Sequence, residues 1–259
     1  MELFYRSYGT GEPVIILHGM LGCADNWHGP ARSLADGRRV IVPDLRNHGR
    51  SPHHDSMTYS DLAGDILEMM DAVGIETAAL AGHSLGGRVA MTVADACPER
   101  VTRLACIDIG PGDYPLRHVP FLKIMADLEL GRFHDRRDVD KALLAQVPDP
   151  ALRQFVLKNL RRTADDGFCW KVNLPVIRAA YAELMKALAL QRRFSNPVLL
   201  LRGGRSEYVD DGQQELFRRY YPRARVETLP AAGHWIHADE PVEFLRTLKT
   251  FLESPANGA

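Results

Sequence analysis

Residues 80–90 read LAGHSLGGRVA, and they place one serine, Ser84, between two apolar stretches. The segment 82–86 is a G-x-S-x-G motif. In this motif the serine occupies a sharp turn between a strand and a helix, where a side chain two positions away would collide with it. The two glycines are then a steric requirement, and the N-terminus of the helix stabilises negative charge beside the serine. The stretch predicts that Ser84 is a nucleophile.

Short apolar runs recur along the rest of the chain and alternate with helical segments. Runs that are continuously apolar are typical of strands covered on both faces. Their alternation with helices predicts an α/β fold with a mostly parallel, doubly wound sheet, and the alternating ELFYRSY (2–8) predicts an antiparallel edge strand. The runs are PVIILHG (13–19), RRVIVPD (38–44), TAALAGH (77–83), RVTRLACID (100–108), NPVLLLRGG (196–204) and RVETLP (225–230), with helical stripes at 58–74 and 85–98.

The pattern breaks once, from about Asp113 to Phe194, where no strand-like run occurs and the apolar spacing is helical. We therefore expect an α/β core at 1–112 and 195–259, with a helical cap inserted at 113–194. The predicted cap contains 15 Lys and Arg residues against 10 Asp and Glu. This charge would suit the steering of anionic acyl donors such as acyl-CoA, although solvated helix faces explain it more simply.

Composition excludes several functional classes. The chain has 259 residues, 46% of them hydrophobic, and a net charge of −1, which is typical of a globular protein and gives no support to nucleic-acid binding. No signal peptide or membrane span is evident, and four scattered cysteines favour a reducing, cytoplasmic compartment. The histidines lack a metal-binding spacing, so no metal site is expected. The tail 253–259 is expected to be disordered.

A serine nucleophile needs donors for the oxyanion and a base. We expect the donors to be the amides of Leu85 and Met20, because the His-Gly-Met segment 18–20 follows an early strand. The loop AAGHWIHADEP (231–241) contains two histidines after the last strand. Gly233 gives His234 room to turn toward the sheet edge, whereas His237 lies near the start of the next helix, so His234 is the predicted base.

These segments together resemble the alpha/beta-hydrolase superfamily, and within it the small serine esterases of the YbfF-type and ABHD11-like group. The resemblance rests on PVIILHGMLG, VPDLRNHGRSPH, LAGHSLGGRVA, CIDIGP and AGHWIHADEP in this order. It covers about 1–112 and 195–254 and is weaker in the predicted cap, where WKVNLPVI is similar to the same group. The RNHG segment (46–49) is expected to shape a loop beside the site and to perform no chemical step.

The acid that orients the base is the one part in which this sequence departs from the common pattern. In many relatives an aspartate stands three residues after a glycine that ends a late strand, but here that position is Ser206, after Gly203. The superfamily also uses the end of the strand after the nucleophile helix, and ACIDIGP places Asp108 there. The resemblance points to Asp108 as well. The alternatives are Glu207, Asp210 and Asp211, in the loop that follows Leu201.

The sequence therefore predicts a serine hydrolase that needs no cofactor and cleaves a small-molecule ester or thioester. Two alternatives remain open at this point. The same triad could catalyse carbon–carbon bond hydrolysis, a lyase reaction or perhydrolysis, and the fold could serve a ligand-binding receptor without catalysis. The oligomeric state is not predicted.

Overall fold

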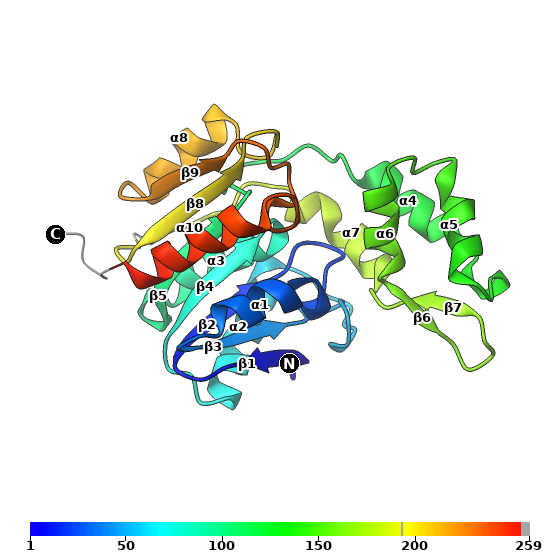
Figure 1. Cartoon of the computed structure of the whole chain (residues 1–259), viewed down its shortest axis with the longest axis horizontal. Helices are drawn as coiled ribbons and strands as arrows, with labels where there is room; N and C mark the ends of the chain where they lie inside the picture. The colour runs from blue at the N-terminus through cyan, green and yellow to red at the C-terminus, as the bar shows by residue number, and fades with distance from the viewer. Residues whose placement is uncertain (193, 255–259) are drawn as a thin grey trace.

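Seven strands form one sheet in the computed structural model of the chain, which describes residues 1–192 and 194–254. The order is β1-β3-β2-β4-β5-β8-β9, and every neighbouring pair is parallel except β1 with β3. Figure 1 shows this twisted sheet with helices on both faces, so the predicted doubly wound fold and its antiparallel edge strand are confirmed. The strands are β1 (Tyr5–Tyr8), β2 (Glu12–Leu17), β3 (Arg38–Pro43), β4 (Ala78–His83), β5 (Val101–Ile107), β8 (Val198–Gly203) and β9 (Arg225–Leu229).

Both faces of the sheet are buried, which explains the continuous apolar runs. Side chains of a strand alternate between faces, so Ile15 and Leu17 join one apolar cluster while Val14 and Ile16 join the other. The first cluster is covered by α2, α3 and α8, and the second by α1 and α10. The helices of the sheet region are α1 (His28–Leu34), α2 (Tyr59–Ala72), α3 (Leu85–Ala96), α8 (Asp211–Tyr220), α9 (Ile236–Asp239) and α10 (Pro241–Glu253), with 3-10 turns at Ala24–Trp27 and Pro98–Arg100.

Strand β5 lies between β4 and β8, and this neighbourhood positions the site. Parallel strands end at the same edge of a sheet, where open α/β sheets build their sites. Ser84 directly follows β4 and Asp108 directly follows β5, while Ser206 follows β8. The amide of Asp108 donates to the Leu201 carbonyl at 2.7 Å, which holds the ends of β5 and β8 together.

The chain between β5 and β8 forms a separate group of elements, drawn in green at the right of Figure 1. Our expectation that this segment contains no strand is wrong, because β6 and β7 form an antiparallel hairpin. Each strand has only three residues, too few to produce a visible alternation, and the turn uses Asp166 at a φ of 62°. The elements are α4 (Val119–Asp127), a 3-10 turn (Leu130–Arg132), α5 (Arg136–Leu144), α6 (Pro150–Leu157), β6 (Leu160–Arg162), β7 (Phe168–Trp170) and α7 (Leu174–Leu184).

Arg88 of α3 fastens both ends of this segment to the sheet region. Its guanidinium is buried and donates to the carbonyls of Leu184 and Lys186 at the end of α7, and to that of Pro111 at the start of the segment. A buried cation needs such partners, because burying an unpaired charge would cost on the order of several kcal/mol. Most of the tail that we expect to be disordered, residues 255–259, lies outside the described residues.

Candidate active site

Ser84 occupies the turn between β4 and α3 with φ 52° and ψ −119°, a conformation that side chains rarely adopt. The neighbouring glycines are required sterically. A β carbon on Gly82 would collide with the carbonyl of Gly86, and one on Gly86 would collide with the carbonyl of Leu17 on the adjacent strand. The backbone strain at Ser84 is thus maintained by close packing on both sides.

Asp108 and His234 are in direct contact. The Nδ1 atom of His234 lies 2.7 Å from Oδ2 of Asp108, which is completely buried. The same carboxylate accepts the Gly203 amide at 3.0 Å on its other oxygen and the hydroxyl of Ser206. Every acceptor oxygen of this buried group is therefore occupied, and the carboxylate is held toward the imidazole.

The other candidate carboxylates are engaged elsewhere. Glu207 forms an exposed ion pair with Arg117. Asp210 caps α8 by accepting the Gln213 amide at 2.8 Å, and Asp211 accepts from the Gln214 side chain in the same helix. Within residues 1–192 and 194–254, none of the three makes a hydrogen bond or ion pair with His234.

Two further side chains fix the loop that carries His234. His83, the residue before Ser84, is buried, and its Nε2 atom lies 2.8 Å from the carbonyl oxygen of His234. Tyr208 stacks on the His234 ring at 3.7 Å between centroids and 14° between planes. Burial and the neighbouring His234 lower the pKa of His83 well below its usual value, so this imidazole is neutral and donates to the carbonyl.

The loop that contains Met20 is oriented by His18. The Leu45 amide donates to Nε2 of this buried imidazole at 3.0 Å, which leaves the proton on Nδ1, 2.8 Å from the Gly19 carbonyl. Burial lowers the pKa of His18 to about 4, consistent with a neutral ring. Carbonyl and N–H point in opposite directions in a trans peptide, so this bond turns the Met20 amide away from His18. No hydrogen bond from the amide of Met20 or Leu85 is found in the described part of the chain.

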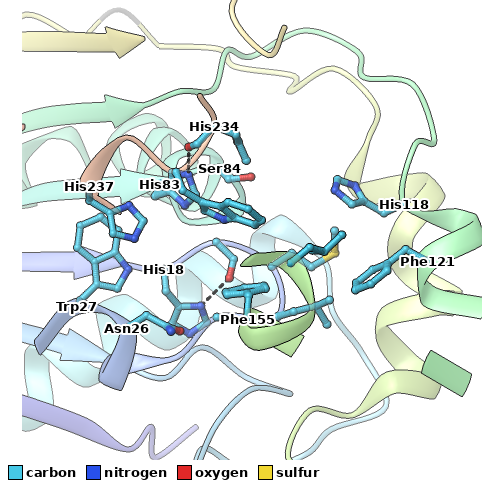
Figure 2. A pocket seen from close by; sticks show the side chains of 16 residues that line it. His18, Asn26, Trp27, His83, Ser84, His118, Phe121, Phe155, His234 and His237 are labelled. Atoms are coloured by element: carbon cyan, nitrogen blue, oxygen red, sulfur yellow. Dashed lines mark hydrogen bonds between the residues drawn. The ribbon is translucent and has the colours of Figure 1, made fainter. Parts of the chain in front are cut away.

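One cavity, open to solvent, lies beside these groups (Figure 2). Ser84, His234 and Met20 line it from the sheet region. Aromatic and aliphatic side chains line it from the segment between β5 and β8, together with His118; they are Phe121, Leu152 and Phe155. Among the described residues Ser84 and His234 share no hydrogen bond, and such contacts commonly tighten only when substrate binds.

His237, the alternative base, lies in the same cavity but does not contact Asp108. Its ring stacks on Trp27 at 4.3 Å between centroids. Burial lowers the pKa of His237 to about 4, and its Nδ1 atom is buried without a hydrogen-bond partner in the described structure. Of the two histidines, His234 is the one whose imidazole contacts the Asp108 carboxylate.

Sequence reasoning missed three contributors to this site. The sequence indicates only that Ser206 stands where many relatives have an aspartate, yet its hydroxyl donates to Asp108. Tyr208 and His118 were not singled out, because an aromatic in a loop and a histidine before a helix carry no local signal. The position of Ser206, three residues after Gly203, was the one visible clue.

Known proteins resemble this chain in sequence and in fold. A family model described as alpha/beta hydrolase fold matches residues 12–169. The chain belongs to the alpha/beta hydrolase family. The hydrolase is 37% identical to the sn-1-specific diacylglycerol lipase ABHD11 of Xenopus laevis, over 98% of this chain and 85% of the relative. It is 30% identical to esterase YbfF of Escherichia coli (strain K12), over 94% of both chains.

Solved structures give the same result. The hydrolase superimposes on a marine microorganism esterase with a TM-score of 0.94 and 35% identity, over 96% of this chain and 99% of that one. The predicted resemblance to the YbfF-type and ABHD11-like group is confirmed, and the chain is an enzyme of the carboxylic ester hydrolase class. In the part of the chain that the structure describes, no helix is long and apolar enough to cross a membrane.

Proposed function

We propose that the hydrolase cleaves carboxylic esters or thioesters through an acyl-enzyme on Ser84, with His234 as base and Asp108 as the acid that orients it. The observation that carries this proposal is the 2.7 Å contact between His234 Nδ1 and Asp108 Oδ2 beside the strained turn of Ser84. The carboxylate fixes the proton of the imidazole on Nδ1, which leaves the lone pair of Nε2 free to accept the proton of Ser84.

The reaction then proceeds in two balanced halves. The Ser84 oxygen attacks the carbonyl carbon as His234 takes the hydroxyl proton, and His234 returns this proton to the leaving alcohol or thiol as the bond to it breaks. Water then attacks the acyl-enzyme with the same base and releases the acid. The amides of Met20 and Leu85 hold the oxyanion in both halves, and their lack of partners among residues 1–192 and 194–254 supports this role.

We further propose that residues 113–194 act as a cap and that no cofactor takes part. The cavity wall contributed by the cap is mainly apolar, which favours esters with an apolar acyl portion. Two relatives are named as a diacylglycerol lipase and an esterase, so acylglycerols and simple esters are the substrates to test beside acyl-CoA thioesters. Four unpaired cysteines support a cytoplasmic location.

Replacement of the nucleophile tests the proposal. Ser84→Ala should fold normally and lose nearly all turnover, on the order of 10⁶ if it behaves as protease triads do. A fluorophosphonate should label the wild type at Ser84 and fail to label the variant. A p-nitrophenyl ester should be turned over many times per protein molecule, and the absence of multiple turnovers would favour the binding receptor instead.

A further inference from the structure

His118 is the one titratable side chain that reaches the candidate cavity from the segment between β5 and β8, within the described residues. It directly precedes α4, and Figure 2 shows its ring projecting into the cavity on the side opposite the His18 loop. His118 also lines a smaller adjoining cavity, together with Tyr181 and Tyr208. The other side chains that this segment contributes to the cavity are apolar; they are Phe121, Leu152 and Phe155.

The hydroxyl of Tyr181 determines which nitrogen of His118 carries the proton. This oxygen accepts the backbone amide of His118 at 3.1 Å and lies 2.9 Å from its Nδ1 atom. Tyr181 is 1% exposed, and its hydroxyl has no further partner in the described structure. Its hydrogen is therefore satisfied only by donating to Nδ1. Burial lowers the pKa of His118, so the ring is neutral and its single proton is on Nε2.

The Nε2–H group of His118 is only weakly engaged. Its neighbour is the hydroxyl of Tyr208 at 3.3 Å, longer than the roughly 2.7–3.2 Å of a good hydrogen bond. Tyr208 stacks on His234, so this donor lies on the side of the cavity occupied by the base. In the proposed reaction His234 returns a proton to the leaving group, and the alcohol portion of an ester must therefore lie on this side.

We infer that His118 is a specificity-determining residue whose Nε2–H binds a second oxygen in the alcohol portion of the substrate, such as the free hydroxyl, ether or ester oxygen of a diol or triol ester. The inference rests on the proposed function, because that function places the alcohol beside His234. A site with a hydrogen-bond donor discriminates against an analogue without the acceptor, since the hydrogen bond to the substrate is then lost. A neutral donor also gives no special preference to anionic groups.

Two pairs of esters of equal length test the inference. They are 2-methoxyethyl butyrate against butyl butyrate, and 3-methoxypropyl butyrate against pentyl butyrate, with acid release followed in a pH-stat. The wild type should favour the ether ester of at least one pair by about tenfold in kcat/KM, as expected for one hydrogen bond. In His118→Phe this ratio should fall to one or below, because an apolar wall disfavours the ether oxygen.

Further variants separate this role from a structural one. His118→Gln keeps an N–H donor and should retain part of the ratio, while Tyr181→Phe frees the tautomer of His118 and should lower it. Lys123→Ala changes an exposed residue of α4 and should leave both the rate and the ratio unchanged. Melting temperatures show whether each variant folds.

A wild-type ratio near one for both pairs, or a ratio that survives in His118→Phe, would overturn the inference. That result is distinguishable from failure of the proposed function. If the plain alkyl esters are hydrolysed in a manner that depends on Ser84, the function stands and only the role of His118 is lost. If Ser84→Ala hydrolyses them as fast as the wild type, both are lost.

Discussion

Replacement of Asp108 by asparagine isolates the orientation of the imidazole from the shape of the site. Asp108 accepts the Gly203 amide on Oδ1, and His234 on Oδ2. The Gly203 donor is fixed by the backbone, so it selects the carbonyl oxygen of the asparagine and leaves the NH₂ group facing His234. The imidazole must then offer its Nδ1 lone pair, which moves its proton to Nε2, where it cannot accept the proton of Ser84.

The expected loss follows from this wrong tautomer. In a serine protease the equivalent change costs about 10⁴ in kcat, and an ester is a less demanding substrate, so we expect a loss between about 10² and 10⁴. This corresponds to about 2.7–5.5 kcal/mol of transition-state stabilisation. The assay is kcat for a p-nitrophenyl ester, with the melting temperature measured on the same samples.

The matched control is Asp210→Asn, because asparagine also caps a helix and the Asp210 side chain accepts the Gln213 amide at the start of α8. It should stay within a few-fold of the wild type, and so should Asp211→Asn. The reasoning fails if Asp108→Asn keeps activity within tenfold of the wild type, or if Asp210→Asn or Asp211→Asn loses more than Asp108→Asn while all remain folded.

Three other predictions follow from packing and charge. In Gly86→Ala the added β carbon would meet the Leu17 carbonyl, so this variant should lose about 1–3 kcal/mol of stability and all turnover. Gly29 has open space around it, so Gly29→Ala should keep both, and equal melting temperatures for the two variants would contradict this reasoning. Burial lowers the pKa values of His18 and His237 to about 4, so the unfolded state binds more protons than the folded state between pH 6.5 and 4. The free energy of unfolding should therefore fall as pH falls through this window, by up to about 3 kcal/mol for each histidine, and a flat profile in urea titrations would refute this. If the basic charge of residues 113–194 steers anionic substrates, added salt should lower kcat/KM for an acyl-CoA ester and not for a neutral ester; parallel salt responses would remove the idea.

Much of the fold was predictable because local chemistry and tertiary burial agree. Strands β2, β4 and β8 are covered on both faces, so their sequences are continuously apolar and stand out from the helical stripes. The turn at Ser84 was predictable because Gly82 and Gly86 are required by close contacts with backbone atoms. These contacts do not depend on the details of side-chain packing. Sequence patterns succeed where a single geometric demand selects the residue type.

The rest depends on contacts between residues far apart in the chain. Tyr181 fixes the tautomer of His118 from 63 positions away, and Tyr208 stacks on His234 from a different loop. No periodicity encodes such pairs, because each partner alone is compatible with an ordinary solvated or core position. The hairpin of β6 and β7 was not predicted for another reason, because strands of three residues are too short to show a period of two.

The position of Asp108, the proposed acid, can be understood from the strand order. Strands β5 and β8 are hydrogen-bonded neighbours, and their carboxyl ends lie side by side. A carboxylate on either end can therefore reach the same imidazole, and here the one after β5 does so. Ser206, which follows β8, donates to that carboxylate, so the acceptor and the donor lie on the two members of one strand pair. An isolated reading of the loop 203–211 finds no acid in place, whereas knowledge of the strand order makes Asp108 the natural partner of His234.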